Sequence, residues 1–462
     1  MKKHSLFKVI GITIIVAVLL TWIFPITYYG YGLTEEARSQ VGLFELFTTG
    51  PTIFYYFGSV IFYVLAIGGF YGVLNKIDGY RNLLDKIADK FKGRESLFLG
   101  IVMVLLAIIT SMVGLTTGLF FVFPFVIAII LLMGYNKATA ALTTIGSVAV
   151  GLIGTTVSAA NINAIVGVLE LDFSSELFAK AIIFLVGLVL LIFNVLSYAK
   201  KHKNGKEEIE LPISKDNKKR SWPIVLVIDL ILVIKILASI SWDTVLGVKL
   251  FDQIHESVMT FEISNFAIFG KLLGEQNALA FGKWTLMEFT MLVTLGSGII
   301  ALIYRQKFSE FLDAFVAGIK KAIKPALLIF FIYMVLVISV THPVLLAICK
   351  PLLTATNGFN VFTMSIVSLL SNIFNVESYY AASGVLPYVV DVIKDTSTYP
   401  LIAIVWQAMQ GFATLVAPTS IVLIATLSYL NISLWQWFKA SWKFILEILV
   451  ALLLIFTILI LI

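Results

Sequence analysis

The sequence predicts an all-α polytopic membrane protein, an inverted-repeat fold with about nine transmembrane helices and two re-entrant hairpins. Composition is the first observation: of 462 residues, 60% are hydrophobic and 13% are charged, and the mean hydropathy is +1.00. These values lie far outside the range of soluble domains. The second observation is that each half of the chain contains a long apolar run that polar residues interrupt.

Simple apolar runs predict the transmembrane helices. Each is long enough to cross a hydrocarbon core of roughly 30 Å. They cover residues 6–28, 52–74, 139–161, 176–198, 223–240, 284–304, 325–345, 397–430 and 434–462. The first run follows Lys2, Lys3 and Lys8 but has full length and no small-residue cleavage site, so we expect a retained helix.

The positive charges predict the orientation. Lysine and arginine gather at the start of the chain and in residues 76–94, 200–220 and 305–324, which should be cytoplasmic. With nine crossings the N-terminus then lies in the cytoplasm and the C-terminus outside. We expect a multi-pass protein of the bacterial cytoplasmic membrane. The net charge of +6 does not indicate nucleic-acid binding, because the chain lacks a basic face interleaved with aromatic residues.

Two apolar segments fit better as hairpins that enter and leave on one side. Residues 97–133 are too long for one helix and contain a polar tip at residues 114–118. Residues 359–393 repeat the pattern, with a tip at residues 375–379. Irregular backbone at membrane depth is tolerated only where it is buried in protein or lines a cavity. Both tips are therefore candidate sites.

Each hairpin is followed by a crossing with its own polar break. The breaks lie at residues 154–161 of the crossing 139–161, and at residues 410–420 of the crossing 397–430. Hairpins that enter from opposite faces and meet beside interrupted helices are typical of inverted-repeat secondary transporters.

A second recurrence supports duplication. Residues 80–91 and 308–319 are short basic segments with one apolar stripe, which suits a helix lying on the membrane interface. The additional crossing at residues 325–345 would place the second hairpin on the opposite face. We therefore predict a first repeat at 1–199, a basic cytoplasmic linker at 200–222 and a second repeat at 223–462.

Several runs resemble a known family. Residues 68–76, residues 410–420 and the following residues 434–439 are similar to the YfcC-like branch of the anaerobic C4-dicarboxylate carriers (DcuC-type), within the ion transporter superfamily. The resemblance extends in order over nearly the whole chain. It implies an inverted-repeat carrier of carboxylates or amino acids, homodimeric, working by an elevator motion and driven by sodium or proton gradients.

The chain departs from that branch at the tips. Residues 114–118 read Gly-Leu-Thr-Thr-Gly where the branch has Gly-Met-Ala-Glu-Glu, and residues 377–381 read Glu-Ser-Tyr-Tyr-Ala where it has Ser-Gly-Ser-Gly-Gln. Asn161-Ile162 replaces an Asn-Pro pair. The carboxylate therefore lies on the other hairpin, and the substrate of the branch does not carry over.

Polar groups at the tips and breaks are the candidate ligands. We predict that the substrate is bound by Thr116, Thr117, Asn161, Asn375, Glu377, Ser378 and Thr419. We predict that a Na⁺ ion is held by Thr155, Thr156, Ser158, Asn372 and Ser420, with freed backbone carbonyls. Helix N-termini beside the breaks would attract a substrate carboxylate. The alternative is that these hydroxyls only bond their own helix backbones.

Glu377 is the central residue of this hypothesis, because an ionisable group at membrane depth is by default a functional site. It would act as a proton carrier, a sodium ligand or a seat for a substrate ammonium group. The alternative is a shallower hairpin with Glu377 at the outer surface. Asp229 and Lys235 fall within one predicted crossing but on different faces, and Lys235 can snorkel.

The sequence supports other classes of function less well. A membrane-embedded enzyme acting on a lipid-linked substrate would need paired acids, a histidine cluster or a metal motif, and we find none and predict no catalytic residue. A channel would need a ring of pore-lining groups from few helices, which the duplicated hairpins disfavour. The single cysteine, Cys349, excludes a disulfide framework. We expect no cofactor beyond a coupling Na⁺ or H⁺.

Overall fold

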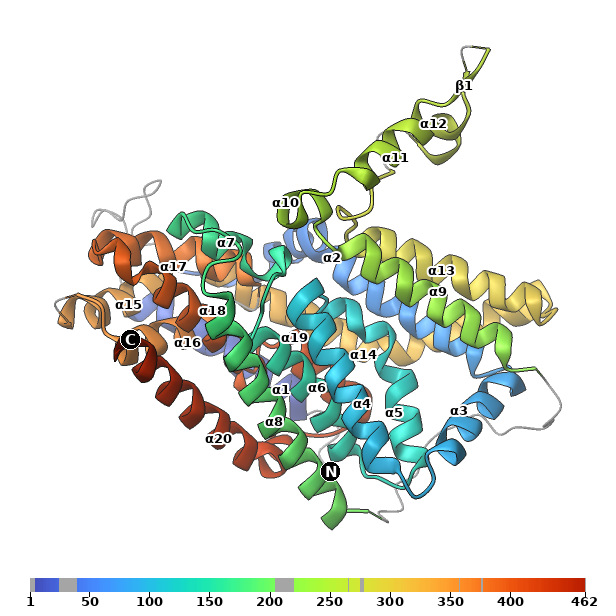
Figure 1. Cartoon of the computed structure of the whole chain (residues 1–462), viewed down its shortest axis with the longest axis horizontal. Helices are drawn as coiled ribbons and strands as arrows, with labels where there is room; N and C mark the ends of the chain where they lie inside the picture. The colour runs from blue at the N-terminus through green and yellow to red at the C-terminus, as the bar shows by residue number, and fades with distance from the viewer. Residues whose placement is uncertain are drawn as a thin grey trace.

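The structure is a computed structural model that describes residues 5–24, 40–203, 220–264, 266–274, 278–356, 358–374 and 377–461. Within these ranges the chain is almost entirely helical (Figure 1). The one sheet pairs β1 (Glu262–Ile263) with β2 (Phe266–Ala267). The predicted all-α membrane fold is confirmed.

Nine helices in the described residues are long and apolar enough to cross a membrane. Seven of them are α1 (Ser5–Ile23), α2 (Leu43–Leu74), α8 (Leu177–Lys201), α9 (Trp222–Ser239), α13 (Leu286–Ile303), α14 (Phe308–Thr341) and α20 (Leu434–Leu461). The others are the segments Glu95–Val113 and Thr396–Leu430. All but one of the predicted crossings coincide with one of these helices; the exception, residues 139–161, is divided into two shorter helices, α6 and α7.

The long helices α2 and α14 pack antiparallel with their backbones in contact. A Cβ placed on Gly72 would lie 2.7 Å from the Cα of Gly318, and one on Gly68 would lie 2.8 Å from the carbonyl oxygen of Gly318. Only small residues allow two helix backbones to approach this closely. This pair forms one side of the molecule, with α1, α9 and α13 beside it.

This packing corrects the prediction for residues 308–319. They form no separate interfacial helix but the first part of α14, which continues through Pro325. One residue of the apolar stripe, Phe315, packs its ring against Gly69 of α2, whereas Phe308 at the start of the stripe is 74% exposed. The first amphipathic segment does form its own helix, α3 (Asp78–Lys90), and the Tyr80 ring packs 6.5 Å from the ring of Phe125.

The first hairpin turns back as predicted. Its arms are α4 (Glu95–Ile108), with the π-helical η1 (Ile109–Val113), and α5 (Phe123–Leu132), which the short η2 (Thr117–Phe121) precedes. Lys203 shows that both outer ends lie together: its Nζ is 3.1 Å from a Glu95 oxygen and 5.8 Å from the centre of the Tyr135 ring. The chain therefore enters and leaves on one side.

The second hairpin follows α15 (Val344–Ala355). Its arms are α16 (Val361–Phe374) and α17 (Ser378–Val392), and the 3₁₀ turn η3 (Thr396–Thr398) leads out of it. Figure 1 shows α16 and α17 on the opposite side of the molecule from α4 and α5. The two hairpins approach the centre from opposite directions.

The two broken helices cross at the centre of the protein. The first consists of α6 (Lys137–Ile153) and α7 (Ala159–Leu169), the second of α18 (Tyr399–Val416) and α19 (Ile421–Leu430). A Cβ on Gly411 would lie 2.7 Å from the Cα of Ile153, so α18 and α6 touch through their backbones. This crossing places both breaks, residues 154–158 and 417–420, next to the hairpin tips.

An arm leaves the body between α9 and α13 (Figure 1). It contains α10 (Trp242–Leu246), α11 (Leu250–Met259), the two strands and α12 (Ile268–Leu273). Its base is held by a hydrogen bond from the Gly282 amide to the Ala238 carbonyl, at 2.9 Å. The predicted linker between the repeats falls between α8 and α9, and residues 204–219 lie outside the described part.

Candidate functional site

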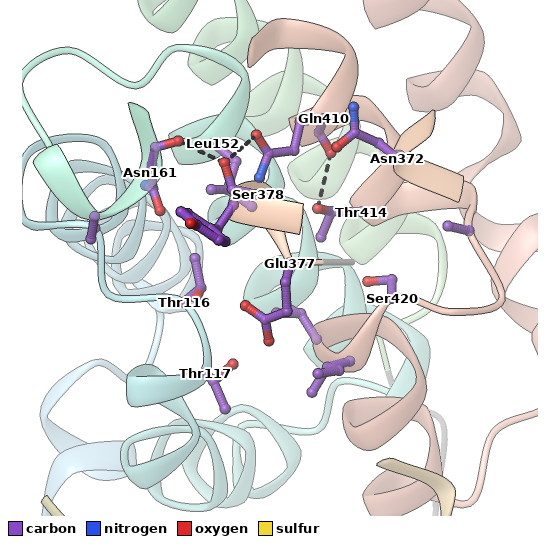
Figure 2. A pocket seen from close by; sticks show the side chains of 17 residues that line it. Thr116, Thr117, Leu152, Asn161, Asn372, Glu377, Ser378, Gln410, Thr414 and Ser420 are labelled. Carbon is purple, nitrogen blue, oxygen red and sulfur yellow. Dashed lines mark hydrogen bonds between the residues drawn. The ribbon is translucent and has the colours of Figure 1, made fainter. Parts of the chain in front are cut away.

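A cavity of about 270 Å³ lies where the two hairpin tips meet the two helix breaks (Figure 2). The first hairpin and first broken helix provide Gly114, Thr116, Thr117, Leu152, Ala160 and Asn161. The second hairpin and second broken helix provide Asn372, Glu377, Ser378, Tyr379, Gln410, Ala413, Thr414, Ala417, Ser420, Ile421 and Val422. Both halves of the chain therefore build one site.

Gly114 makes the turn of the first tip. Its φ of +83° lies in the left-handed region, and a Cβ there would overlap the side chain of Ser158 and lie 3.0 Å from the Cβ of Ala160. Glycine adopts this backbone without the steric cost that other residues meet. The hydroxyl of Thr110 then donates to the Leu115 carbonyl at 3.0 Å, which closes the turn and directs the next residues, Thr116 and Thr117, into the cavity.

The first tip is bonded to the break between α6 and α7. The Ser111 hydroxyl donates to the Gly154 carbonyl at 2.7 Å, and the Thr156 amide donates to the Ser111 carbonyl at 3.1 Å. The Asn161 amide group donates to the Thr110 carbonyl at 3.3 Å. Backbone groups that the break frees thus find partners on the hairpin, as buried polar groups require.

The second tip joins the two halves. The Ser378 hydroxyl lies 2.8 Å from the Asn161 carbonyl of α7 and 3.1 Å from the Gln410 Oε1 of α18 (Figure 2). The Thr419 hydroxyl donates to the Ile373 carbonyl at the end of α16. The second hairpin is therefore held by both broken helices, and its first turn faces the cavity.

Glu377 places a carboxylate in the cavity wall. It is the N-cap residue of α17, and the Tyr333 hydroxyl of α14 donates to its Oε1 at 2.7 Å. Figure 2 shows the carboxylate pointing toward Thr116 and Thr117 of the first tip. Among the described residues that line the cavity there is no lysine or arginine.

Three helices begin at the cavity. The first residues of α7, α17 and α19 include Asn161, Ser378 and Ile421, which all line it. A helix N-terminus has unpaired N–H groups and a partial positive charge, and it binds anions. The site therefore combines one carboxylate, that of Glu377, with three helix N-termini that favour negative charge.

The structure places most of the predicted site residues at the cavity. Thr116, Thr117, Asn161, Glu377 and Ser378 of the predicted substrate ligands line it, as do Asn372 and Ser420 of the predicted sodium ligands. Asn375 lies outside the described residues.

The remaining predicted residues lie behind the wall. The Thr155 hydroxyl donates to its own helix at the Leu152 carbonyl, 3.0 Å away, and the Thr156 hydroxyl lies 3.3 Å from that of Ser111. The Thr419 hydroxyl donates to the Ile373 carbonyl, as described above. Ser158 borders a separate cavity of about 30 Å³. The hydroxyls of Thr156 and Thr419 thus connect the breaks to the hairpins, whereas the buried Ser158 hydroxyl has no partner among the described residues.

Three functional candidates were absent from the predicted set. Gln410 and Thr414 line the cavity from α18, and both belong to the polar run 410–420 that marked the break. Tyr333 contacts Glu377 from α14 and stacks on Phe57 with ring centres 4.1 Å apart. A tyrosine inside an apolar run carries no local signal of that role.

The cavity also offers oxygen ligands for a cation. In the described ranges no group of three or more His, Cys, Asp and Glu side chains is placed to hold a metal ion. The Asn372 side-chain oxygen is buried at the cavity and has no hydrogen-bond donor among the described residues. Glu377 and the two threonines of the first tip line the same cavity, and their oxygens are of the type that suits a hard cation.

Comparison with known proteins places the chain among carriers. No curated protein matches it. The solved structure of the Alcanivorax borkumensis YdaH transporter, described as having an unusual topology, aligns over 98% of this chain and 97% of its own, with 10% identity and a TM-score of 0.42. The family model of the C4-dicarboxylate anaerobic carriers (DcuC) matches residues 54–462, and this chain, a multi-pass membrane protein, belongs to that family.

Proposed function

We propose that the protein is a secondary active transporter for a small carboxylate-bearing metabolite, an amino acid or a C4-dicarboxylate, driven by a Na⁺ or H⁺ gradient or by exchange. One observation carries the proposal: both hairpin tips and both helix breaks border a single cavity with one carboxylate and three helix N-termini. Broken helices around a central site are how secondary transporters bind an ion and a substrate.

The helix N-termini would bind the substrate carboxylate. Backbone N–H groups at the starts of α7, α17 and α19, with the hydroxyls of Thr116 and Thr117, would donate to its oxygens. A volume of about 270 Å³ suits a small metabolite.

The carboxylate of Glu377 would attract an amino acid and repel a dicarboxylate. An amino acid would place its ammonium group on this carboxylate, whereas a dicarboxylate would bring two more negative charges toward it. Two unit charges 4 Å apart repel by about 4 kcal/mol at an effective dielectric constant of 20. Transport of a dicarboxylate would therefore need a proton or Na⁺ on Glu377, and the coupling ion would bind there together with Asn372.

The motion we propose is an elevator movement of the hairpins and broken helices against α2 and α14. Hydrogen bonds join each hairpin to a broken helix, as with Ser111 on Gly154 and Thr419 on Ile373, so they can move as one body. We also propose that two inverted repeats, residues 1–199 and 223–462, build this arrangement, and that the chain catalyses no reaction.

We propose a homodimer with the N-terminus in the cytoplasm and the C-terminus outside. The membrane-spanning helix α9 exposes Asp229 on the outside of the monomer. Ionisable side chains in such helices almost always face protein or a water-filled cavity, and a second copy would cover this one. Native mass spectrometry of the protein in detergent tests the dimer, and a monomer at all concentrations contradicts it.

Uptake into proteoliposomes tests the function. Vesicles with the purified protein are offered labelled amino acids and C4-dicarboxylates under an inward Na⁺ gradient, an inward H⁺ gradient, or with the same solute inside. We expect one class to accumulate above its equilibrium level, and protein-free vesicles are the control. If no carboxylate solute accumulates or exchanges under any of the three conditions, the proposal is wrong.

A further inference from the structure

Lys235 is a buried lysine that the cavity does not use. It lies in α9, its side chain is 0% exposed, and its Nζ donates to the Gly118 carbonyl at 2.6 Å and to the Tyr63 hydroxyl. Three aromatic rings surround the nitrogen: the centres of Tyr63, Phe289 and Phe121 lie at 4.5, 4.9 and 5.4 Å. The amino group therefore points inward and does not snorkel.

No carboxylate among the described residues forms an ion pair with Lys235, and Asp229 of the same helix is exposed on another face. An ionisable group that is buried without a carboxylate partner is costly in a membrane-spanning helix, and such groups mark functional positions. The aromatic faces and the Gly118 carbonyl are what stabilise it here.

The partner of Lys235 is the tip of the first hairpin. Gly118 follows Thr117, which lines the cavity. The same carbonyl of Gly118 also accepts a hydrogen bond from the Tyr63 hydroxyl at 2.7 Å, and the Phe121 carbonyl accepts one from Tyr71 at 2.7 Å. Side chains of α2 and α9 thus hold η2, the segment that supports the first wall of the cavity.

The second tip is held in a comparable way. Tyr333 of α14 donates to Glu377, and α14 is joined to α2 through their touching backbones. Each tip is therefore bonded on one side to a broken helix and on the other to the body formed by α2, α9 and α14. The contacts on the second side are the ones that an opening motion must break.

We infer that Lys235 is a positioning residue for transport. Its hydrogen bonds hold the first hairpin tip, with Thr116 and Thr117, against α2 and α9, and they break when the cavity opens to the other side of the membrane. This inference rests on the proposed function. Removing one partner of a buried hydrogen bond costs about 1 to 3 kcal/mol, which is enough to shift a conformational equilibrium by about tenfold. Loss of the Lys235 hydrogen bonds should therefore change the turnover rate and the accessibility of the cavity from each side, while the groups that bind substrate stay in place.

The test measures access to the cavity directly. Thr414, which lines it, is replaced by cysteine in a Cys349→Ala background, and a membrane-impermeant thiol reagent is applied to proteoliposomes from each side. We expect Lys235→Met to change the ratio of labelling rates from the two sides by about tenfold. Lys180→Met is the matched control, because Lys180 is also buried, at 3% exposure, but forms no hydrogen bond to either hairpin tip among the described residues. It should leave the ratio unchanged.

Transport kinetics provide the second readout. In the natural Thr414 background, Lys235→Met should change the maximal rate at least fivefold and the KM for substrate less than twofold, and Lys235→Gln, which keeps a donor, should recover part of the rate. If Lys235→Met does not fold, Tyr63→Phe removes one donor to Gly118 and should shift the labelling ratio in the same direction by a smaller factor.

Two outcomes overturn the inference. One is a folded Lys235→Met protein with the labelling ratio and maximal rate of the parent; the other, where only Tyr63→Phe folds, is an unchanged labelling ratio in that variant. A wild-type protein without uptake would instead contradict the proposed function, and the labelling ratio, which needs no substrate, would still decide whether Lys235 holds the tip.

Discussion

The Tyr333 hydroxyl donates to a carboxylate oxygen of Glu377 at 2.7 Å, and this contact joins α14 to the tip of the second hairpin. The ring of Tyr333 is fixed in turn by stacking on Phe57 of α2. A group that binds at Glu377 must therefore share the carboxylate with Tyr333 or displace it. This geometry connects occupation of the cavity to the contact between the hairpin and the rest of the protein.

Replacing Glu377 by glutamine should abolish gradient-driven uptake and leave the protein folded. The amide keeps the shape and still accepts a hydrogen bond from Tyr333, but it carries no charge for a proton, a sodium ion or a substrate ammonium group. Since burying a charge is costly, thermal stability should stay equal or rise. Proteoliposome uptake and a thermal melt measure the two effects.

The control is Asp391→Asn, which removes an exposed carboxylate from the same hairpin. It should change neither uptake nor thermal stability. Uptake by Glu377→Gln at the parent rate, with the same pH and sodium dependence, would show that coupling resides elsewhere.

Tyr333→Phe should make a coupling ion bind more tightly at Glu377. The variant keeps the stack on Phe57 but removes the hydroxyl that competes for the carboxylate. A hydrogen bond to a charged group is worth about 1.5 to 3 kcal/mol, so the ion concentration that gives half-maximal uptake should fall about tenfold. Tyr399→Phe, which loses a bond to the Ile393 carbonyl at the outer end of the hairpin, is the control. An unchanged half-maximal concentration would contradict the prediction.

Ser378→Ala should weaken substrate binding. The serine hydroxyl contacts the Asn161 carbonyl and the Gln410 side chain, so its loss leaves two cavity residues without this partner. At about 1 kcal/mol for one such bond, the KM for substrate should rise about fivefold. Ser365→Ala is the matched control, because Ser365 donates only to the Val361 carbonyl within α16, at 2.7 Å. Equal KM values for the two variants would speak against a role for Ser378.

Gly114→Ala should lower the stability of the first hairpin. Its φ of +83° costs an L-residue about 1 to 2 kcal/mol, and the new methyl group would also overlap Ser158, which adds at least about 1 kcal/mol. Gly134→Ala isolates the backbone part, since Gly134 has a φ of +82° and open space around its Cβ position. Unfolding in SDS compares the two variants. If Gly134→Ala costs as much as Gly114→Ala, contact with Ser158 is not the reason for the glycine.

The sequence alone was sufficient to predict the class of fold and the places where helices are interrupted. Apolar runs reveal membrane helices because the bilayer selects their length and composition. The polar runs at residues 114–118 and 410–420 correctly marked a tip and a break, since polar residues inside an apolar run are retained only where the backbone or a side chain needs them. The family resemblance followed from such runs and is confirmed.

Tertiary structure decided which polar groups face the cavity. Thr117 points into it while Thr155 donates to its own helix, although both are threonines in an interrupted run. The choice depends on which carbonyls the neighbouring helix leaves within reach, and a local pattern does not contain that information. The sequence of residues 308–319 likewise predicted a separate helix at a membrane interface, but the segment is continuous with α14, and Gly69 of α2 leaves room for the ring of Phe315.

Tyr333 and Lys235 show the same limit most clearly. Each lies within an apolar run, and each contacts a hairpin tip that is far away in the sequence. Composition and spacing determined that this protein crosses a membrane and where its helices break. Only the packing of distant segments decided that a tyrosine would face the one carboxylate of the cavity and that a lysine would bind the opposite tip, because those contacts arise from backbone positions set by the whole fold.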